Sequence, residues 1–249
     1  MPVSLQAGAW GLLAGSALVL GAGAAWFVQI PRTVVAGVMA FGSGVLISAL
    51  SFDLMSEAEA TGGLLAAALG FALGAALYVA LDLLLGRRGA GHRKRSSGAQ
   101  ARESDVPGSG LAIAFGALLD GVPESAALGL TLLDGGAVGV SVLVAIFLSN
   151  LPEGLSSTAG MKQAGRSAGY VFSVWTGIAV ASGLAGLVGV LLLDGAPLGW
   201  VGGINALAAG GILAMIVNTM IPEAFERAHA FSGLICATGF LLAFVIGRV

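Results

Sequence analysis

Long apolar stretches dominate the chain, and polar residues fall mostly between them. A membrane-spanning helix needs about 20 mostly apolar residues, and eight stretches come near or exceed that length. Turn-forming or charged residues mark most of the breaks, namely Pro31-Arg32, Thr61-Gly62-Gly63, Asp134-Gly135-Gly136 and Asp194-Gly195-Ala196-Pro197. The predicted helices cover residues 7–29, 33–56, 62–85, 110–133, 137–160, 168–193, 198–222 and 230–247.

Composition supports the same fold class. Hydrophobic residues make up 57% of the chain and charged residues 10%, whereas a soluble domain has about 25% charged residues. The first apolar run lacks a basic start and exceeds the roughly 7–15 residues of a signal peptide core, so we expect a retained membrane helix. Residues 1–249 are therefore predicted to form a single all-α integral membrane domain.

Basic residues set the predicted orientation. If the N-terminus lies outside, ten of the eleven Lys and Arg residues fall in cytoplasmic loops, and only Arg248 falls outside. Most of them lie in a linker at about 86–109, which is predicted to be flexible and to contact anionic membrane lipid. It has no interleaved aromatic residues to stack bases, so no nucleic acid partner is expected. The prediction is a multi-pass protein of the cell membrane, with eight transmembrane helices and both termini outside.

Five acidic residues fall within predicted spans: Asp120, Glu124 and Glu153 away from the span ends, and Asp53 and Asp82 towards them. Each acid at mid-depth costs roughly 2.5–3.5 kcal/mol on insertion scales. No Lys or Arg lies in the core of any predicted span, so an internal salt bridge is not expected. Either the acids are protonated, or they line a polar cavity and bind a metal cation or a proton in transit. Asp82, near a helix end, is expected to reach towards the basic linker.

Two predicted helices carry the same Pro-Glu motif. Residues four apart share a helix face, so each glutamate lies beside the polar residue that opens its motif. Each proline leaves a backbone carbonyl without its usual donor. Carboxylate, amide, hydroxyl and carbonyl oxygens together suit a hard cation. The motifs are Asp120-Gly121-Val122-Pro123-Glu124 and Ser149-Asn150-Leu151-Pro152-Glu153.

The motif helices are predicted to run in opposite directions, and a fainter echo joins residues 53–58 with residues 218–224. Inverted repeats around a site at the bilayer midplane are typical of transporters. The pattern therefore predicts an inverted-repeat architecture of three, two and three helices.

Taken together, these residues resemble the ZIP (Zrt/Irt-like) family of divalent-metal transporters. The resemblance covers nearly the whole chain and includes the Pro-Glu motifs, the long loop before residue 110 and the ending Met220-Ile221-Pro222-Glu223-Ala224. It implies a binuclear metal centre between the fourth and fifth helices. By motif, it implies the metal ligands Glu124, Glu153 and Asn150, and places Asp120, Ser149 and Asp53 where the family usually has histidine or another ligand.

The histidine positions of the family are not filled by histidine here. Imidazole favours zinc, copper and iron, whereas carboxylate and carbonyl oxygens suit magnesium, calcium and manganese. The resemblance implies a secondary transporter that moves zinc, manganese or iron into the cytoplasm as substrate, without a prosthetic group. The alternative is a non-transporting ZIP-like membrane scaffold or metal sensor with a degenerate site.

Two further expectations concern activity and assembly. No HExxH motif occurs in the chain, so an enzyme is not expected. Small-residue runs such as Gly183-Leu184-Ala185-Gly186 allow helices to approach within one chain or between two chains of a homodimer.

Overall fold

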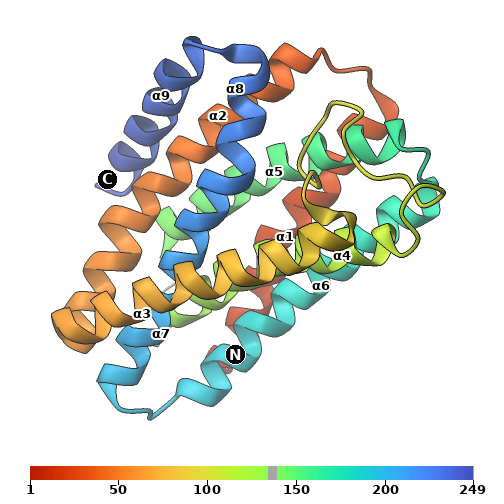
Figure 1. The fold of residues 1–249 in the computed structure, drawn as a ribbon. Coiled ribbons are helices and arrows are strands. Elements are labelled where there is room, and N and C mark those ends of the chain that lie inside the picture. The colour runs from red at the N-terminus through yellow and green to blue at the C-terminus, as the bar shows by residue number, and fades with distance from the viewer. Residues whose placement is uncertain (134–138, 249) are drawn as a thin grey trace.

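A computed structural model describes residues 1–133 and 139–248 (Figure 1). Helices account for most of these residues, and no β-strand occurs among them. The α-helices are α1 (Val3–Phe27), α2 (Arg32–Ala49), α3 (Met55–Leu85), α4 (Ser109–Leu130), α5 (Val140–Gln163), α6 (Ala168–Leu193), α7 (Leu198–Met215), α8 (Ile221–Ala228) and α9 (Phe231–Ile246). The π-helical segments are η1 (Leu50–Leu54), η2 (Gly86–Ala90) and η3 (Ile216–Met220).

Six helices in the described ranges are long and apolar enough to cross a membrane, and α9 is a shorter apolar helix. One of the six is a continuous helical run from Arg32 to Ala90. It bends at Gly63, whose φ of 79° and ψ of 163° are conformations that glycine adopts without a steric penalty. The predicted break at residues 61–63 is therefore a bend within one helical run rather than a gap between two helices. The predicted break at 134–136 lies outside the described residues.

Side chains on α3 show how the exterior suits lipid. Leu65, Leu69, Leu73 and Leu77 follow each other at four-residue spacing, and 48–73% of each side chain is exposed. Residues at this spacing lie on one face of a helix. A continuous ridge of exposed leucines would be costly in water and is stable in hydrocarbon. The chain therefore has the build of a multi-pass membrane protein.

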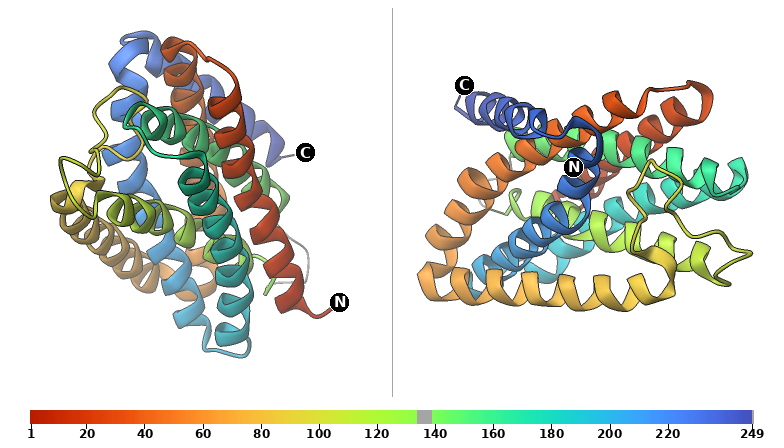
Figure 2. Two further views of the ribbon diagram at one scale, coloured as in Figure 1. Left: turned by 90° about the vertical axis from the view of Figure 1, so that its right-hand side faces the viewer. Right: turned by 45° about the horizontal axis from the view of Figure 1, so that its top comes forward.

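Glycines allow helix pairs to approach closely. A Cβ atom at Gly44 of α2 would collide with the backbone carbonyl of Cys236 on α9, and one at Gly74 of α3 would collide with that of Leu207 on α7. Between membrane helices, small residues replace the hydrophobic effect as the basis of tight packing. α1 packs in the same way against α5 and α6 (Figure 2).

The α2 and α7 regions have matching boundaries. α2 and η1 cover 32–49 and 50–54, and α7 and η3 cover 198–215 and 216–220. Every boundary in the second region lies 166 residues after its counterpart, and both helices begin directly after a proline. The same offset relates Glu57 to Glu223. The two regions run in opposite directions in Figure 1, as the predicted echo between residues 53–58 and 218–224 requires.

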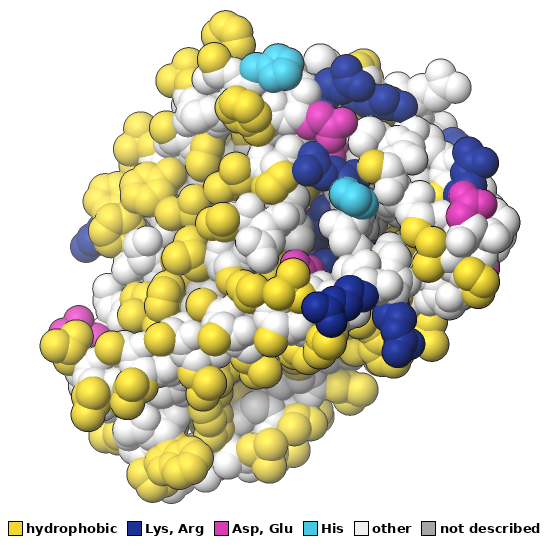
Figure 3. All heavy atoms as spheres, viewed as in Figure 1, with side chains coloured by type: hydrophobic (Ala, Val, Ile, Leu, Met, Phe, Trp, Pro, Cys, Tyr) yellow, Lys and Arg dark blue, Asp and Glu magenta, His cyan; other side chains and the backbone are white. Residues whose placement is uncertain are grey.

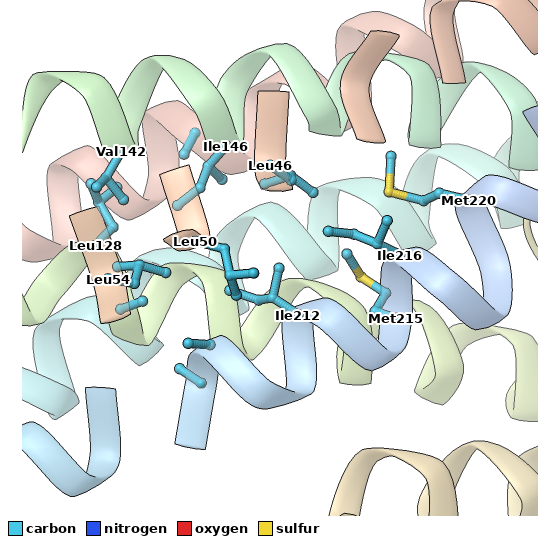
Figure 4. Packing of buried hydrophobic residues seen from close by; sticks show 14 of the residues in the cluster. Leu46, Leu50, Leu54, Leu128, Val142, Ile146, Ile212, Met215, Ile216 and Met220 are labelled. Carbon is cyan, nitrogen blue, oxygen red and sulfur yellow. The ribbon is translucent and has the colours of Figure 1, made fainter. Parts of the chain in front are cut away.

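The largest apolar cluster packs where these two regions meet α4 and α5. It includes Leu46, Leu50, Ile146, Ile212 and Ile216, all buried (Figure 4). The π-helical segments contribute Leu50 and Ile216 to it. This cluster fixes α4 and α5, the two helices that carry the Pro-Glu motifs.

Candidate metal centre

The three predicted acids lie inside the bundle. α4 continues through Pro123 and places Asp120 and Glu124 one turn apart, while α5 continues through Pro152 and supplies Glu153. The exposed fractions of Asp120, Glu124 and Glu153 are 1%, 1% and 3%. None of them faces lipid, and one ammonium group, that of Lys94, lies within 3.4 Å of both Asp120 and Glu153.

Two basic side chains of the linker enter this centre. Arg93 and Lys94 have exposed fractions of 1% and 4%. The expectation that no basic residue reaches the buried acids is therefore wrong, and so is the expectation of a flexible linker at this point. The physical reason is that three buried carboxylates lie close together inside the bundle, and Coulombic attraction in a medium of low dielectric constant draws the cations of the linker inward.

Arg93 binds Asp120 through both arms of its guanidinium group. Its Nε donates to Asp120 Oδ2 at 2.9 Å and its Nη2 donates to Asp120 Oδ1 at 2.8 Å. The hydroxyl of Tyr78 on α3 also donates to Asp120 Oδ1, at 2.7 Å. Arg93 Nη1 pairs with Asp82 at 2.6 Å, so Asp82 does reach the linker as expected. A bidentate Arg–carboxylate pair is the strongest kind of charged hydrogen bond.

Lys94 lies between the two motif helices. Its Nζ is 2.6 Å from Glu153 Oε1 and 3.4 Å from Asp120 Oδ2. Both contacts are ion pairs, and neither is aligned as a hydrogen bond. One ammonium group thus joins a carboxylate of α4 to a carboxylate of α5.

Glu124 differs from its neighbours. Both of its carboxylate oxygens are buried and have no hydrogen-bond partner. It lies within electrostatic reach of Glu153, Asp120 and Lys94. Burial of an ionised carboxylate without a hydrogen-bond partner costs free energy and is rare in proteins. The Glu124 carboxyl is therefore a group that a proton or a bound cation would stabilise.

Ser149 and Asn150 are buried beside the centre, and their hydrogen bonds lead elsewhere. The Ser149 hydroxyl donates to the carbonyl of Ile146 in its own helix. The Asn150 amide donates to the carbonyl of Ala14 on α1, and its oxygen Oδ1 is buried without a partner. Asn150 therefore retains a free acceptor, whereas Ser149 uses its donor within α5.

Asp53 lies away from the centre. Its hydrogen-bond donor is Ser141, at 3.3 Å and near the start of α5. Ser141 precedes Glu153 by twelve positions, which is about 18 Å of helix. The structure therefore brings together Asp120, Glu124 and Glu153 and keeps Asp53 apart from them.

A further buried acid, Glu223 on α8, contacts the linker nearer the end of the bundle. Its Oε1 accepts hydrogen bonds from the Ser96 backbone amide and hydroxyl. The Ser156 hydroxyl lies 3.1 Å from the same oxygen, but its shorter contact is with the Lys94 carbonyl. Its Oε2 has no hydrogen-bond partner and lies 3.9 Å from Arg95 Nη1.

Four residues around the centre were not predicted from the sequence motifs, namely Tyr78, Arg93, Lys94 and Glu223. The available signal was charge balance, because the densest basic run of the chain directly precedes the helices that carry the unbalanced acids.

In the described ranges, no group of three His, Cys, Asp or Glu side chains is arranged to hold a metal ion. Within the same centre, Lys94 separates Asp120 from Glu153. On the face in Figure 3, most Lys and Arg side chains gather over the linker and the adjoining helix ends, and hydrophobic side chains are the main coloured type elsewhere. No family model matches the chain, and no curated protein matches it in sequence.

Proposed function

We propose that this protein is a secondary transporter that moves a divalent metal cation across the membrane into the cytoplasm. The observation that supports the proposal best is the convergence of Asp120, Glu124 and Glu153 on one buried centre, with an ammonium group between α4 and α5. The resemblance to the ZIP family supports the same reaction. Zinc, manganese and iron are the proposed substrates.

The proposed arrangement in the membrane has eight crossings in an inverted 3+2+3 repeat, with both termini outside. The bend at Gly63 would divide the helical run from Arg32 to Ala90 into two crossings. The matched α2 and α7 regions, which run in opposite directions, support the inverted repeat. α9 has 16 residues and is about 24 Å long, so the bilayer would thin locally around it.

Oxygen chemistry defines the proposed site. Asp120, Glu124 and Glu153 would supply carboxylate oxygens, and Asn150 would supply its free amide oxygen. Ser149 would assist only after its hydroxyl leaves the Ile146 carbonyl. Asp53 would act at a distance from this centre, on the outer approach. The carboxylates bind a cation only when ionised, so loading should weaken as the pH falls.

The alternative proposal is a ZIP-like scaffold or sensor that does not transport. It is favoured by one observation: Arg93 and Lys94 already neutralise Asp120 and Glu153, so these acids do not require a metal for stability. In this alternative, the linker stays permanently in the centre.

Metal uptake by the purified protein in liposomes tests the two functions. We expect saturable uptake of radioactive zinc or manganese by the wild type, and loss of uptake in Glu124→Gln, because that change removes a charge that no protein group balances. Glu59→Gln is the matched control, since Glu59 is an exposed acid outside the centre. Full uptake by Glu124→Gln would contradict the site. No uptake and no saturable metal binding by the wild type would favour the scaffold.

A further inference from the structure

Residues 93–96 of the linker, here called the plug segment, occupy the space between the acidic centre and the end of the bundle where the linker enters. Arg93 and Lys94 lie on Asp120 and Glu153, and Ser96 lies on Glu223. Arg95 pairs with Glu226 at 2.8 Å. The plug segment thus follows a line of acidic groups from the inside of the bundle to its surface.

The backbone carbonyls of the plug segment all accept hydrogen bonds. The Gln100 amide donates to the carbonyls of Arg93 and Arg95, at 2.8 and 3.1 Å. The Ser156 hydroxyl donates to the Lys94 carbonyl at 2.7 Å, and the Gln163 amide donates to the Ser96 carbonyl at 2.7 Å. Buried backbone carbonyls need such partners, and here α5 provides two of the donors. The plug segment therefore has a specific seat on the bundle.

Two glycines shape that seat. A Cβ atom at Gly116 of α4 would lie 2.6 Å from Arg93 Cδ and 2.9 Å from Arg93 Nε. A Cβ atom at Gly160 of α5 would collide with the Arg95 carbonyl and the Gln100 amide. The two motif helices thus lack side chains at the two places where the plug segment lies against them.

The charges of the centre would allow a divalent cation to compete with the plug segment for the carboxylates. Four carboxylates, Asp82, Asp120, Glu124 and Glu153, surround the two cations Arg93 and Lys94. The two cations together have the charge of one divalent ion, and Glu124 remains unpaired. A divalent cation that binds Asp120, Glu124 and Glu153 can therefore replace both basic groups, whereas a monovalent cation leaves the centre with excess negative charge.

We infer that the plug segment is an autoinhibitory, tethered substitute for the transported cation. It occupies the cation path, it leaves when a divalent cation binds, and its seat selects divalent over monovalent ions. This inference rests on the proposed transport function. The exposed residues on both sides of the plug segment, including Arg87, Arg88 and Arg102, remain outside the bundle and connect it to η2 and α4.

Limited trypsin digestion of the purified protein tests the inference, because the linker contains its own controls. Without metal, we expect cleavage after the exposed Arg87, Arg88 and Arg102 and resistance after the buried Arg93 and Lys94. Saturating manganese should expose Arg93 and Lys94 to cleavage. Potassium at the same ionic strength should leave them protected.

Glycine variants can disturb the plug segment without changing the three proposed metal ligands. Gly116→Ala and Gly160→Ala should expel the plug segment and permit cleavage after Lys94 without metal. If the open state of the wild type is populated at about 10%, manganese should bind these variants about tenfold more tightly. Gly177→Ala on α6 is the matched control, because a Cβ atom there meets no other atom within 4 Å.

The outcomes distinguish the two proposals. If manganese binds the wild type but cleavage after Arg93 and Lys94 does not change, the plug inference is overturned and the transport proposal stands. Equal cleavage and equal manganese affinity in Gly116→Ala, Gly160→Ala and wild type would overturn it as well. If manganese binds neither the wild type nor the open glycine variants, the transport function itself fails.

Discussion

At the scale of single residues, Glu124 and Glu153 have opposite roles in stability although they occupy equivalent motif positions. Glu153 balances a buried ammonium group, whereas Glu124 has no partner. Removal of one member of a buried ion pair leaves an uncompensated charge, which costs about 3–5 kcal/mol. Removal of an unpaired buried carboxylate incurs no such cost.

We therefore expect Glu153→Gln to lower the unfolding temperature of the metal-free protein in detergent, and Glu124→Gln to leave it unchanged or raise it. The double variant Glu153→Gln/Lys94→Met is the control, since it removes both charges and should recover most of the lost stability. Equal losses in both single variants would show that Lys94 does not pair selectively with Glu153.

The sequence indicated which acids are buried in the bundle and did not indicate which basic groups neutralise their charge. Asp120, Glu124 and Glu153 were identifiable because charge within an apolar run is costly wherever the helix packs. Arg93 and Lys94 were not, because their burial depends on a contact between a polar loop and helices 27 to 59 residues further along the chain. Local periodicity contains no information on such a contact.

At the scale of elements, the start of α4 is fixed by the linker residue Glu103. Its carboxylate accepts from the backbone amides of Gly108 and Gly110 and pairs with Arg166 at 2.6 Å. The Arg166 guanidinium and these two amides lower the pKa of Glu103 from 4.5 to about 2. Free amides at a helix start and the positive end of the helix dipole both favour a carboxylate there.

A depressed pKa stabilises the folded protein above the ordinary pKa, and this contribution is lost as the pH falls from 4.5 through about 2. Glu103→Gln should therefore unfold at a lower temperature than the wild type near neutral pH, and the difference should shrink and vanish as the pH approaches 2. Thermal unfolding in detergent across this range measures it.

The effect should be modest and weaken with added salt, because the Glu103 side chain is about half exposed. Asp105→Asn is the control in the same linker, since Asp105 accepts a hydrogen bond only from the adjacent Ser104 hydroxyl. A difference between Glu103→Gln and wild type that persists unchanged at acid pH would contradict this role.

Most helices were predictable from apolar run length, and α6 and the start of α7 agree with the prediction to the residue. The π-helical segments were not predictable, because an i→i+5 hydrogen bond leaves no mark in apolar spacing. The sequence also predicted a gap between two helices at residues 57–61, where the structure has continuous helix. The turn-forming residues there produce a bend at Gly63 and do not end the helix.

At the scale of the whole molecule, the proposed transport direction depends on which side of the membrane the plug segment faces. Eight crossings place both termini on one side and the linker on the other, and the basic linker favours the cytoplasm. Seven or nine crossings would separate the termini. Reversal of the whole arrangement would place the plug segment at the outer mouth of the path.

Single cysteines in a Cys236→Ser background can distinguish these arrangements. We expect an impermeant maleimide to label Pro2→Cys and Arg248→Cys on intact cells, and to label Gly98→Cys in the linker only after permeabilisation. All three positions are exposed in the structure, so labelling reports the side of the membrane and not burial. Labelling of only one terminus on intact cells would rule out eight crossings. Labelling of Gly98→Cys alone would reverse the orientation, and the same acidic centre would then open to the outside beneath the plug segment.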